Sequence, residues 1–548
     1  MRRQRWMSMS PQYRPGRGRR AGLARLAVLV SVPVLSVSVL SACGASSTTQ
    51  ASVSATSAAP SASTSASPLA SSSTTVPAAG QPGNGTAVAS DDDCAVLASG
   101  GVDCWGDNSY DQLGNGTTTQ SSTAAVAVVG LGGSGLLSGV ASLVAGDNSH
   151  CAVLHSGGVD CWGNGAQGQL GNGQANENDS DVPVAVAGAG GTGTLSGVAS
   201  LASGGNDYCA ILTSGGTDCW GNDAEGELGH ATTGTSNVPV AVLGPGGTGT
   251  LSGVKQVVGS GSSGYDNSFC ALLTSGGVDC WGDNTAEDLG IKSTQDSHVP
   301  VAVLGLSGQG TLSGATSLAY GYEGYCAVVT SGGVDCWGLN TVGQLGSGVV
   351  CPRSPDGPPA CPDQDTAVAI AGLGKAGTQV ASVVSDLGSS FCAILVSGGV
   401  DCWGKGQNGE LGTGQTNGFS SEVPTAVLGV GGTGALSGVA NMDSNDDGYC
   451  AALTSGGVDC WGENITGDLG AGTMTGPRQC LDFTPCAPEP AAVVGVGGTG
   501  VLSGVKSVVP GATGSYGNCV VLTSGGMDCW GASLGGTSDV PVALPLPA

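Results

Sequence analysis

Cysteine is the residue type whose spacing indicates most about chemistry in this chain of 548 residues, which has 21 cysteines. Sixteen of them form eight pairs whose members stand ten residues apart, on either side of a Ser-Gly-Gly turn centred on the serine. Residues at equal distances from a hairpin apex face each other, with Cα atoms ~4.5–5.5 Å apart, and this geometry suits a disulfide. The predicted pairs are Cys94/Cys104, Cys151/Cys161, Cys209/Cys219, Cys270/Cys280, Cys326/Cys336, Cys392/Cys402, Cys450/Cys460 and Cys519/Cys529.

Five cysteines stand outside these hairpins. Cys351/Cys361 and Cys480/Cys486 would staple two insertions, and Cys43 is left unpaired. A thiolate metal site is the rival interpretation, but the Cys-x2-Cys spacing that such sites use is absent from the sequence. We therefore expect disulfides, an oxidising compartment, and no metal or cofactor.

Other reactive residue types are sparse or out of context. His150 precedes Cys151 at a position where other repeats have Tyr or Phe, so we interpret it as packing. Ser533 has the spacing of a nucleophile elbow, but no strand-to-helix turn or base accompanies it. No catalytic residue is predicted, and we expect a protein that is not an enzyme.

Acidic residues suggest one weak metal site. Asp443, Asn445 and Asp447 resemble the opening of a calcium loop, but its twelfth position is Thr454 and a strand flanks it. An Asp also precedes the second cysteine of each hairpin pair, and we expect these residues to form a solvated outer face.

Two insertions break the pattern of the repeats. Residues 349–364 and 474–490 follow the same point of the fifth and seventh repeats. They carry Arg353, Arg478 and Phe483, which are candidates for partner binding because loops on a rigid scaffold often carry recognition residues. The alternative is a pair of tolerated surface insertions.

The elements that position these residues recur eight times. Each unit has an apolar run, a Cys-Ala-x-Leu strand, a Ser-Gly-Gly turn, a Val-Asp-Cys-Trp-Gly strand, a Gly-rich loop and a strand such as 238–242. Four short strands per repeat are typical of a propeller blade, so the fold class is all-β. The marker tryptophans are Trp105, Trp162, Trp220, Trp281, Trp337, Trp403, Trp461 and Trp530.

The Ser-Gly-Gly-Val-x-x-Trp-Gly core, with loops such as 168–171 and 343–346 (Gly-Gln-Leu-Gly), resembles the regulator of chromosome condensation (RCC1-type) repeat. The resemblance implies a single β-propeller of four-stranded blades over 86–548. Members of this family usually have seven blades, so eight repeats leave seven or eight blades open. We expect the end strands, near 86–90 and 540–544, to close the ring.

The amino-terminal region reads as a targeting segment. Eight of the fifteen basic residues lie in the first 25, an apolar run follows, and Leu40-Ser41-Ala42-Cys43 resembles a bacterial lipobox. This resemblance implies a signal peptide over 1–42 and lipidation of Cys43; the alternative is a plain signal cut elsewhere. Residues 43–85, rich in Ser, Thr, Ala and Pro, would form a disordered tether.

Charge limits the possible partners. Beyond residue 42 there are seven basic against 41 acidic residues, a formal charge of −34, so nucleic acid is an unsuitable partner. We expect a monomeric, non-catalytic binding or scaffold lipoprotein on the outer face of the cell membrane, or secreted, that meets the membrane only through its lipid anchor. Its partner, a protein or a wall polymer, would bind the propeller loops. Alternatives are an inhibitor of a secreted enzyme, an extracellular propeller hydrolase or lyase and, last, guanine-nucleotide exchange by analogy with the family.

Overall fold

The computed structural model describes residues 88–89 and 94–544, apart from 119–120, 175–177, 261–266, 323, 350–360, 387, 417–419, 445–446, 510–516 and 533–536. The chain divides into two compact units, 1–73 and 74–548. All described residues belong to the second unit. The predicted signal peptide, Cys43 and the whole of the predicted tether, 43–85, lie outside the described residues.

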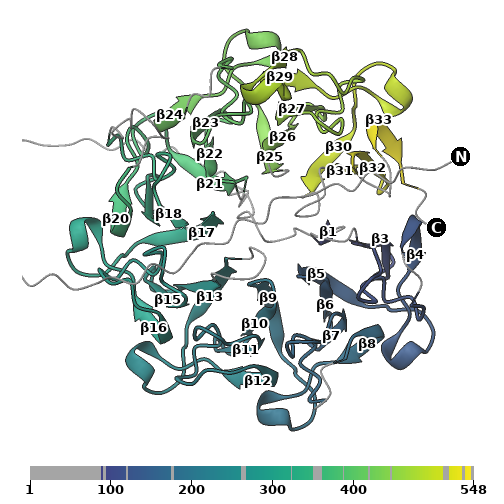
Figure 1. Ribbon diagram of the computed structural model, residues 1–548, viewed down its shortest axis with the longest axis vertical. Helices are drawn as coiled ribbons and strands as arrows, with labels where there is room; N and C mark the ends of the chain where they lie inside the picture. Colours follow the sequence, from purple (N-terminus) through teal and green to yellow (C-terminus); the bar gives the residue numbers. More distant parts are fainter. Residues whose placement is uncertain are drawn as a thin grey trace, which may run out of the picture. The chain divides into compact units, whose positions relative to one another are not determined.

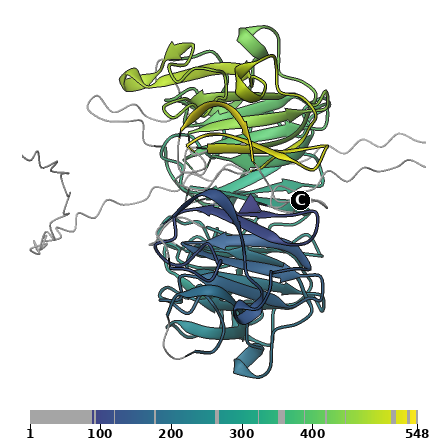
Figure 2. The ribbon, with the colours of Figure 1, turned by 90° about the vertical axis from the view of Figure 1, so that its right-hand side faces the viewer.

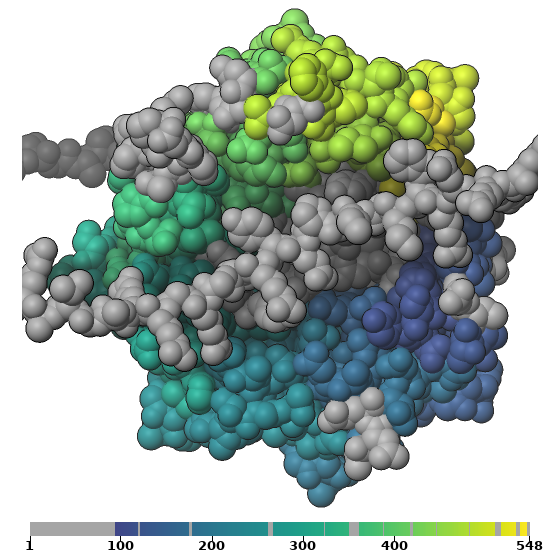
Figure 3. Space-filling model, viewed as in Figure 1, coloured from purple at the N-terminus to yellow at the C-terminus, as the bar shows by residue number. Residues whose placement is uncertain are grey.

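The described residues form eight antiparallel sheets, each made of consecutive strands. The sheets stand around a common axis as the blades of a propeller, with the first strand of each blade nearest the axis (Figure 1). Edge-on, the blades form one layer (Figure 2), and they follow one another around the ring in sequence order (Figure 3). The structure thus resolves the choice between seven and eight blades in favour of eight.

The first four blades have the following strands: β1 (Val88–Ala89), β2 (Cys94–Val96), β3 (Val102–Gly106) and β4 (Ser122–Ala127); β5 (Val140–Gly146), β6 (Ser149–Leu154), β7 (Val159–Gly163) and β8 (Ser180–Ala185); β9 (Val198–Ser203), β10 (Asp207–Leu212), β11 (Thr217–Gly221) and β12 (Ser236–Ala241); β13 (Val254–Gly259), β14 (Ser268–Leu273), β15 (Val278–Gly282) and β16 (Ser297–Ala302).

Blades 5 to 8 have these strands: β17 (Ala315–Gly321), β18 (Gly324–Val329), β19 (Val334–Gly338) and β20 (Gln364–Ala369); β21 (Val380–Ser385), β22 (Ser390–Leu395), β23 (Val400–Gly404) and β24 (Ser421–Ala426); β25 (Val439–Ser444), β26 (Gly448–Leu453), β27 (Val458–Glu463), β28 (Arg478–Gln479) and β29 (Pro485–Ala492); β30 (Val505–Val509), β31 (Gly517–Leu522), β32 (Met527–Gly531) and β33 (Ser538–Ala543).

Short 3₁₀ turns are the helical elements of the described residues, and none of these elements is long and apolar enough to cross a membrane. Six of them lie in the loops that lead from one blade to the next, and one, η6, lies in the insertion of blade 7. They are η1 (Leu131–Gly133), η2 (Ala189–Gly191), η3 (Pro245–Gly247), η4 (Leu306–Gly308), η5 (Val430–Gly432), η6 (Leu481–Phe483) and η7 (Val496–Gly498).

The ring closes by packing of side chains between blades 8 and 1. Trp105 and Ala95 of blade 1 share a buried cluster with Val509 and Met527 of blade 8. The two end strands stay in their own blades, where β1 pairs with β2 and β33 with β32. Closure therefore needs no exchange of strands between the ends of the chain.

The hairpin register brings the paired cysteines directly opposite each other, as in Cys209 and Cys219. All eight predicted hairpin disulfides form, and their sixteen cysteines are buried. The confirmed pairs are Cys94–Cys104, Cys151–Cys161, Cys209–Cys219, Cys270–Cys280, Cys326–Cys336, Cys392–Cys402, Cys450–Cys460 and Cys519–Cys529. Their Cα atoms are 4.0–4.1 Å apart, which is shorter than the predicted ~4.5–5.5 Å. These separations are closest to those of non-hydrogen-bonded pairs, where facing side chains are nearest.

The two disulfides predicted for the insertions have different outcomes. Cys480–Cys486 forms in blade 7, with Cα atoms 5.9 Å apart. In the insertion of blade 5, Cys361 is buried and disulfide-bonded, but Cys351 lies outside the described residues. The staple of blade 7 is therefore confirmed, and Cys351 as the partner of Cys361 stays a prediction.

Each blade has two buried faces because side chains alternate along a strand. The face with Cys209 and Cys219 in blade 3 packs against Ala271 and Trp281 of blade 4. The buried indole N–H of Trp281 also donates to the backbone oxygen of Glu227 in blade 3, at 2.7 Å. Equivalent hydrogen bonds at six other interfaces join the marker tryptophan to the preceding blade. We call this hydrogen bond the tryptophan latch.

The predicted ring of solvated Asp residues was wrong. Asp103 and its equivalents precede the second cysteine, two residues before the marker tryptophan, and so share its face. Asp103 is buried, and burial raises its pKa. Six of its seven equivalents are buried as well: Asp160, Asp218, Asp279, Asp335, Asp459 and Asp528.

Candidate functional site

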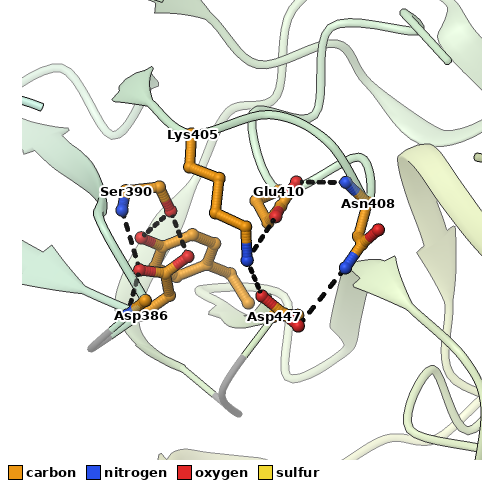
Figure 4. A network of polar contacts seen from close by, with 8 residues as sticks. Asp386, Ser390, Lys405, Asn408, Glu410 and Asp447 are labelled. Atoms are coloured by element: carbon orange, nitrogen blue, oxygen red, sulfur yellow. Dashed lines mark hydrogen bonds and ion pairs between the residues drawn. The ribbon is translucent and has the colours of Figure 1, made fainter. Parts of the chain in front are cut away.

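Six polar residues meet on one rim of the ring, where blade 6 adjoins blade 7 (Figure 4). We call Asp386, Ser390, Lys405, Asn408, Glu410 and Asp447 the Lys405 cluster. The turn from β21 to β22, the first residue of β22, the loop after β23 and the turn from β25 to β26 supply them. In antiparallel blades these three connections lie at the same edge of the sheet, which brings the six residues together.

Lys405 lies at the centre of this cluster. Its Nζ is 3.4 Å from Oε1 of Glu410 and contacts Oδ1 of Asp447 in the neighbouring blade. Asn408 holds both acids, since its backbone N–H donates to Oε2 of Glu410 at 2.7 Å and its Nδ2 donates to Oδ2 of Asp447 at 3.3 Å. The two carboxylates are thereby fixed on either side of the ammonium group.

Asp386, just before β22, is the third acid of the cluster. Its carboxylate accepts hydrogen bonds from the backbone N–H groups of Gly388 and Ser390, both at 2.8 Å. The Ser390 hydroxyl donates to Asp386 at 2.5 Å and lies 2.8 Å from the hydroxyl of Tyr449. This part of the cluster is buried between the two blades.

Burial sets the protonation of the acids. It raises the pKa of Glu410 to about 8 and that of Asp386 to about 6, although Lys405 opposes both shifts. Burial also lowers the pKa of Lys405, but the carboxylates of Glu410, Asp447 and Asp386 outweigh it and raise that pKa above its ordinary value. The cluster therefore holds an ammonium group among acids with a high affinity for protons.

The same three acids could hold a metal ion by their geometry alone. One oxygen from each of Asp386, Glu410 and Asp447 lies within 4.8 Å of the others. The Lys405 ammonium lies among these oxygens and already supplies the positive charge that the acids require.

Sequence analysis did not single out this cluster, although a signal exists. Lys405 follows the Trp-Gly pair of repeat 6, where the other repeats have Asp107, Asn164, Asn222, Asp283, Leu339, Glu463 and Ala532. A cation at this repeat position, in a chain with seven basic residues beyond residue 42, marks the place where the ring departs from its own pattern.

The predicted calcium loop is instead a β-hairpin. Asp443 lies in β25 opposite Cys450, and Asp447 lies just before β26. Asp447 faces Lys405 and Asn408, and Asp443 accepts a hydrogen bond from the backbone of Ser444. Asn445 lies outside the described residues. The two aspartates thus belong to different local networks.

The insertion at 474–490 adds a fifth strand to the outer edge of blade 7. β28 pairs with β29, the Cys480–Cys486 disulfide closes the turn between them, and Arg478 forms an ion pair with Glu489 at 3.1 Å. Phe483, within this turn, is 80% exposed.

The insertion also rests on the loop of the Lys405 cluster, because the backbone N–H of Leu481 donates to the backbone oxygen of Gln407 at 3.3 Å. Arg353 of the other predicted insertion and Ser533 lie outside the described residues. The structure therefore brings Arg478 and Phe483 together with the cluster on blades 6 and 7.

Comparison with known proteins finds relatives that carry the same repeat. No protein-family model matches the chain. E3 ubiquitin-protein ligase HERC2 of Mus musculus is 26% identical over 388 residues, which cover 68% of this chain and 7% of the relative. The ultraviolet-B receptor UVR8 of Arabidopsis thaliana is 29% identical over 205 residues, 36% of this chain and 42% of the receptor. The chain thus spans less than half of either relative.

Solved structures with a similar arrangement include Prp20p of Saccharomyces cerevisiae and human WBSCR16. Each is 18% identical to this chain and matches 78% of it, with TM-scores of 0.49 and 0.45; the matches cover 91% and 84% of those chains. The repeat motifs, the eight antiparallel blades and the sequence relatives together describe an eight-bladed β-propeller whose repeats resemble those of the RCC1 type.

Proposed function

We propose that this protein is a non-catalytic, extracytoplasmic binding protein that recognises its partner through the insertion of blade 7. The observation that carries the proposal is the 80% exposure of Phe483 in a segment that is otherwise held firmly. Exposing a large aromatic side chain to water is unfavourable, and a contact that buries it would stabilise a complex.

The rigidity of this insertion supports a role in recognition. A disulfide, a two-residue strand pairing and the Arg478–Glu489 ion pair fix its backbone, so little conformational entropy would be lost on binding. Leu481, which is 41% exposed, lies in the same η6 turn and adds apolar surface to that of Phe483. Aromatic and aliphatic anchors of this kind dominate the energetics of many interfaces.

The cysteines support the proposed location. Nine disulfides among the described residues indicate an oxidising, extracellular environment. In our proposal a lipid on Cys43 anchors a monomer to the outer face of the membrane, and residues 43–85 hold the propeller away from it. The partner would be a protein or a wall polymer, and inhibition of a secreted enzyme is one form that such binding could take.

A capture experiment tests this proposal. The exported protein, immobilised on beads, is incubated with solubilised cell envelope, and the retained material is compared between wild type and Phe483→Ser. Leu306→Ser is the matched control because Leu306 is 46% exposed in η4, in the loop that follows blade 4. We expect Phe483→Ser to lose a specific species that Leu306→Ser retains; equal retention by both variants would exclude the insertion as the binding surface.

A further inference from the structure

We propose that Lys405 and Asp447 become joined by an amide bond between their side chains, with Glu410 transferring the proton. Such a bond is a covalent modification that ties blade 6 to blade 7. The three groups that the reaction needs, an amine, a carboxyl group and a neighbouring acid with a high affinity for protons, are the central members of the Lys405 cluster.

The positions of these groups suit the reaction. Nζ of Lys405 already contacts Oδ1 of Asp447, so the nucleophile is next to the carboxyl carbon that it must attack. Oε1 of Glu410 is 3.4 Å from the same Nζ and is buried without a hydrogen-bond donor of its own. Nδ2 of Asn408 donates to Oδ2 of Asp447, where negative charge would develop during attack.

The reaction is a condensation that needs no oxidant or reductant. Glu410, as a carboxylate, accepts a proton from the Lys405 ammonium, and the freed amine attacks the Asp447 carboxyl carbon. The tetrahedral intermediate then loses one oxygen, which leaves as water with protons from the amine and from Glu410. An N–C bond forms, a C–O bond breaks, and Glu410 returns to its starting state.

This proton transfer is uphill, because the surrounding carboxylates raise the pKa of the Lys405 ammonium, and the burial of Glu410 makes it less so. Glu410 and Asp386 are both buried, and burial raises the affinity of Glu410 for a proton. The ammonium form of Lys405 is the stable starting state, so passage of its proton to Glu410 must precede attack. Because the three groups are held together within one folded chain, a slow reaction that occurs once per molecule is sufficient.

Such a bond would add a covalent link between two blades. Each of the nine disulfides whose two cysteines are both described lies within a single blade, so none of them holds one blade to the next. Lys405 and Asp447 belong to different blades, and no other repeat has a lysine at the position of Lys405. The bond would also brace the loop whose Gln407 supports the insertion.

Peptide mass analysis of the exported full-length protein tests the proposal directly. Trypsin would cut after Lys375, Lys405 and Arg478, and it does not cut after a lysine whose side chain is an amide. After reduction and alkylation, we expect residues 376–478 as one peptide, lighter by about 18 Da, the mass of one water, and without fragment ions from single cleavages between 405 and 447. Separate peptides 376–405 and 406–478 at unmodified masses would overturn the proposal.

Three variants assign the roles. Lys405→Arg keeps the charge and the cleavage site and should yield the two separate peptides. Glu410→Gln should reduce the cross-linked fraction at least about tenfold, because a general acid–base group contributes a factor of that size or more. Glu227→Gln is the matched control, because Glu227 holds the repeat position of Glu410 in blade 3, away from the Lys405 cluster, and this variant should keep the bond. A fully cross-linked Glu410→Gln protein would overturn the role of Glu410.

Discussion

Asp223 is a buried acid at a repeat position where four other repeats have asparagine, and Asp223→Asn should stabilise the propeller. Its Oδ1 accepts the backbone N–H of Leu228 at 3.1 Å, as the side-chain oxygens of the asparagines do for their own leucines. The amide of Asn108 also donates to a carbonyl nine residues further on, which a carboxylate cannot do. The equivalent residues are Asn108, Asn284, Asn340 and Asn464.

The size of the effect follows from the pKa. Burial raises the pKa of Asp223 from 3.8 to about 7, with Glu227 adding to the shift. Because the pKa is higher in the folded state, the ionised form of Asp223 destabilises the fold. The free energy of unfolding is therefore highest below the unfolded pKa and falls as the pH rises through the folded pKa. The shift corresponds to at most about 4 kcal/mol at pH 8. Stabilising consensus changes usually yield about 0.5–2 kcal/mol, so we expect a gain of about 1–2 kcal/mol at pH 8 and less than half of that at pH 5.

Urea unfolding followed by far-ultraviolet circular dichroism at pH 5 and pH 8, with the disulfides intact, measures the effect. The matched control is Asp296→Asn, a change of the same type at an exposed acid whose side chain accepts the backbone N–H of Asn284. If Asp223→Asn gains as much at pH 5 as at pH 8, ionisation of Asp223 is not the cause. If it loses stability at pH 8, the reasoning from the repeats fails.

Three further predictions concern the blade interfaces and the insertion. Trp220→Phe should cost about 2–4 kcal/mol in urea unfolding, from an unpaired buried oxygen of Gln169 and lost contact area. Tyr208→Phe should cost only about 1 kcal/mol, the net worth of a typical hydrogen bond, because Phe269 and Phe391 fill the equivalent position without a hydroxyl; equal losses for the two variants would refute the latch. Replacing Cys480 and Cys486 by serine should remove about 2 kcal/mol of local stability and speed amide hydrogen exchange in 474–490 while exchange in blade 3 stays unchanged.

Local sequence patterns were sufficient to predict the blades. The equal distance of each cysteine pair from its serine fixes the hairpin register, and the structure has that register, as in Cys151 opposite Cys161. The number of blades stayed open because the packing of blade 8 on blade 1 depends on residues more than 400 positions apart, such as Trp105 and Val509. Repeat motifs define a blade but not the angle between blades.

The candidate site could be predicted only in part. Phe483 and Arg478 stood out because the insertion interrupts the repeat. The Lys405 cluster did not, since Lys405 and Asp447 come from different repeats and meet only when blade 7 packs on blade 6. The Asp residues before the second cysteine were misjudged for a similar reason, because the neighbouring blade buries a face that looks exposed in an isolated repeat.

Photo-cross-linking in intact cells tests most directly whether the blade 7 insertion is the recognition surface. A photoreactive phenylalanine analogue replaces Phe483 in one strain and Leu306 in another, and the products are compared after irradiation. We predict one discrete, higher-mass product or one linked polymer species from position 483 and none from position 306. The same products from both positions, or none from position 483, would contradict the proposed binding surface.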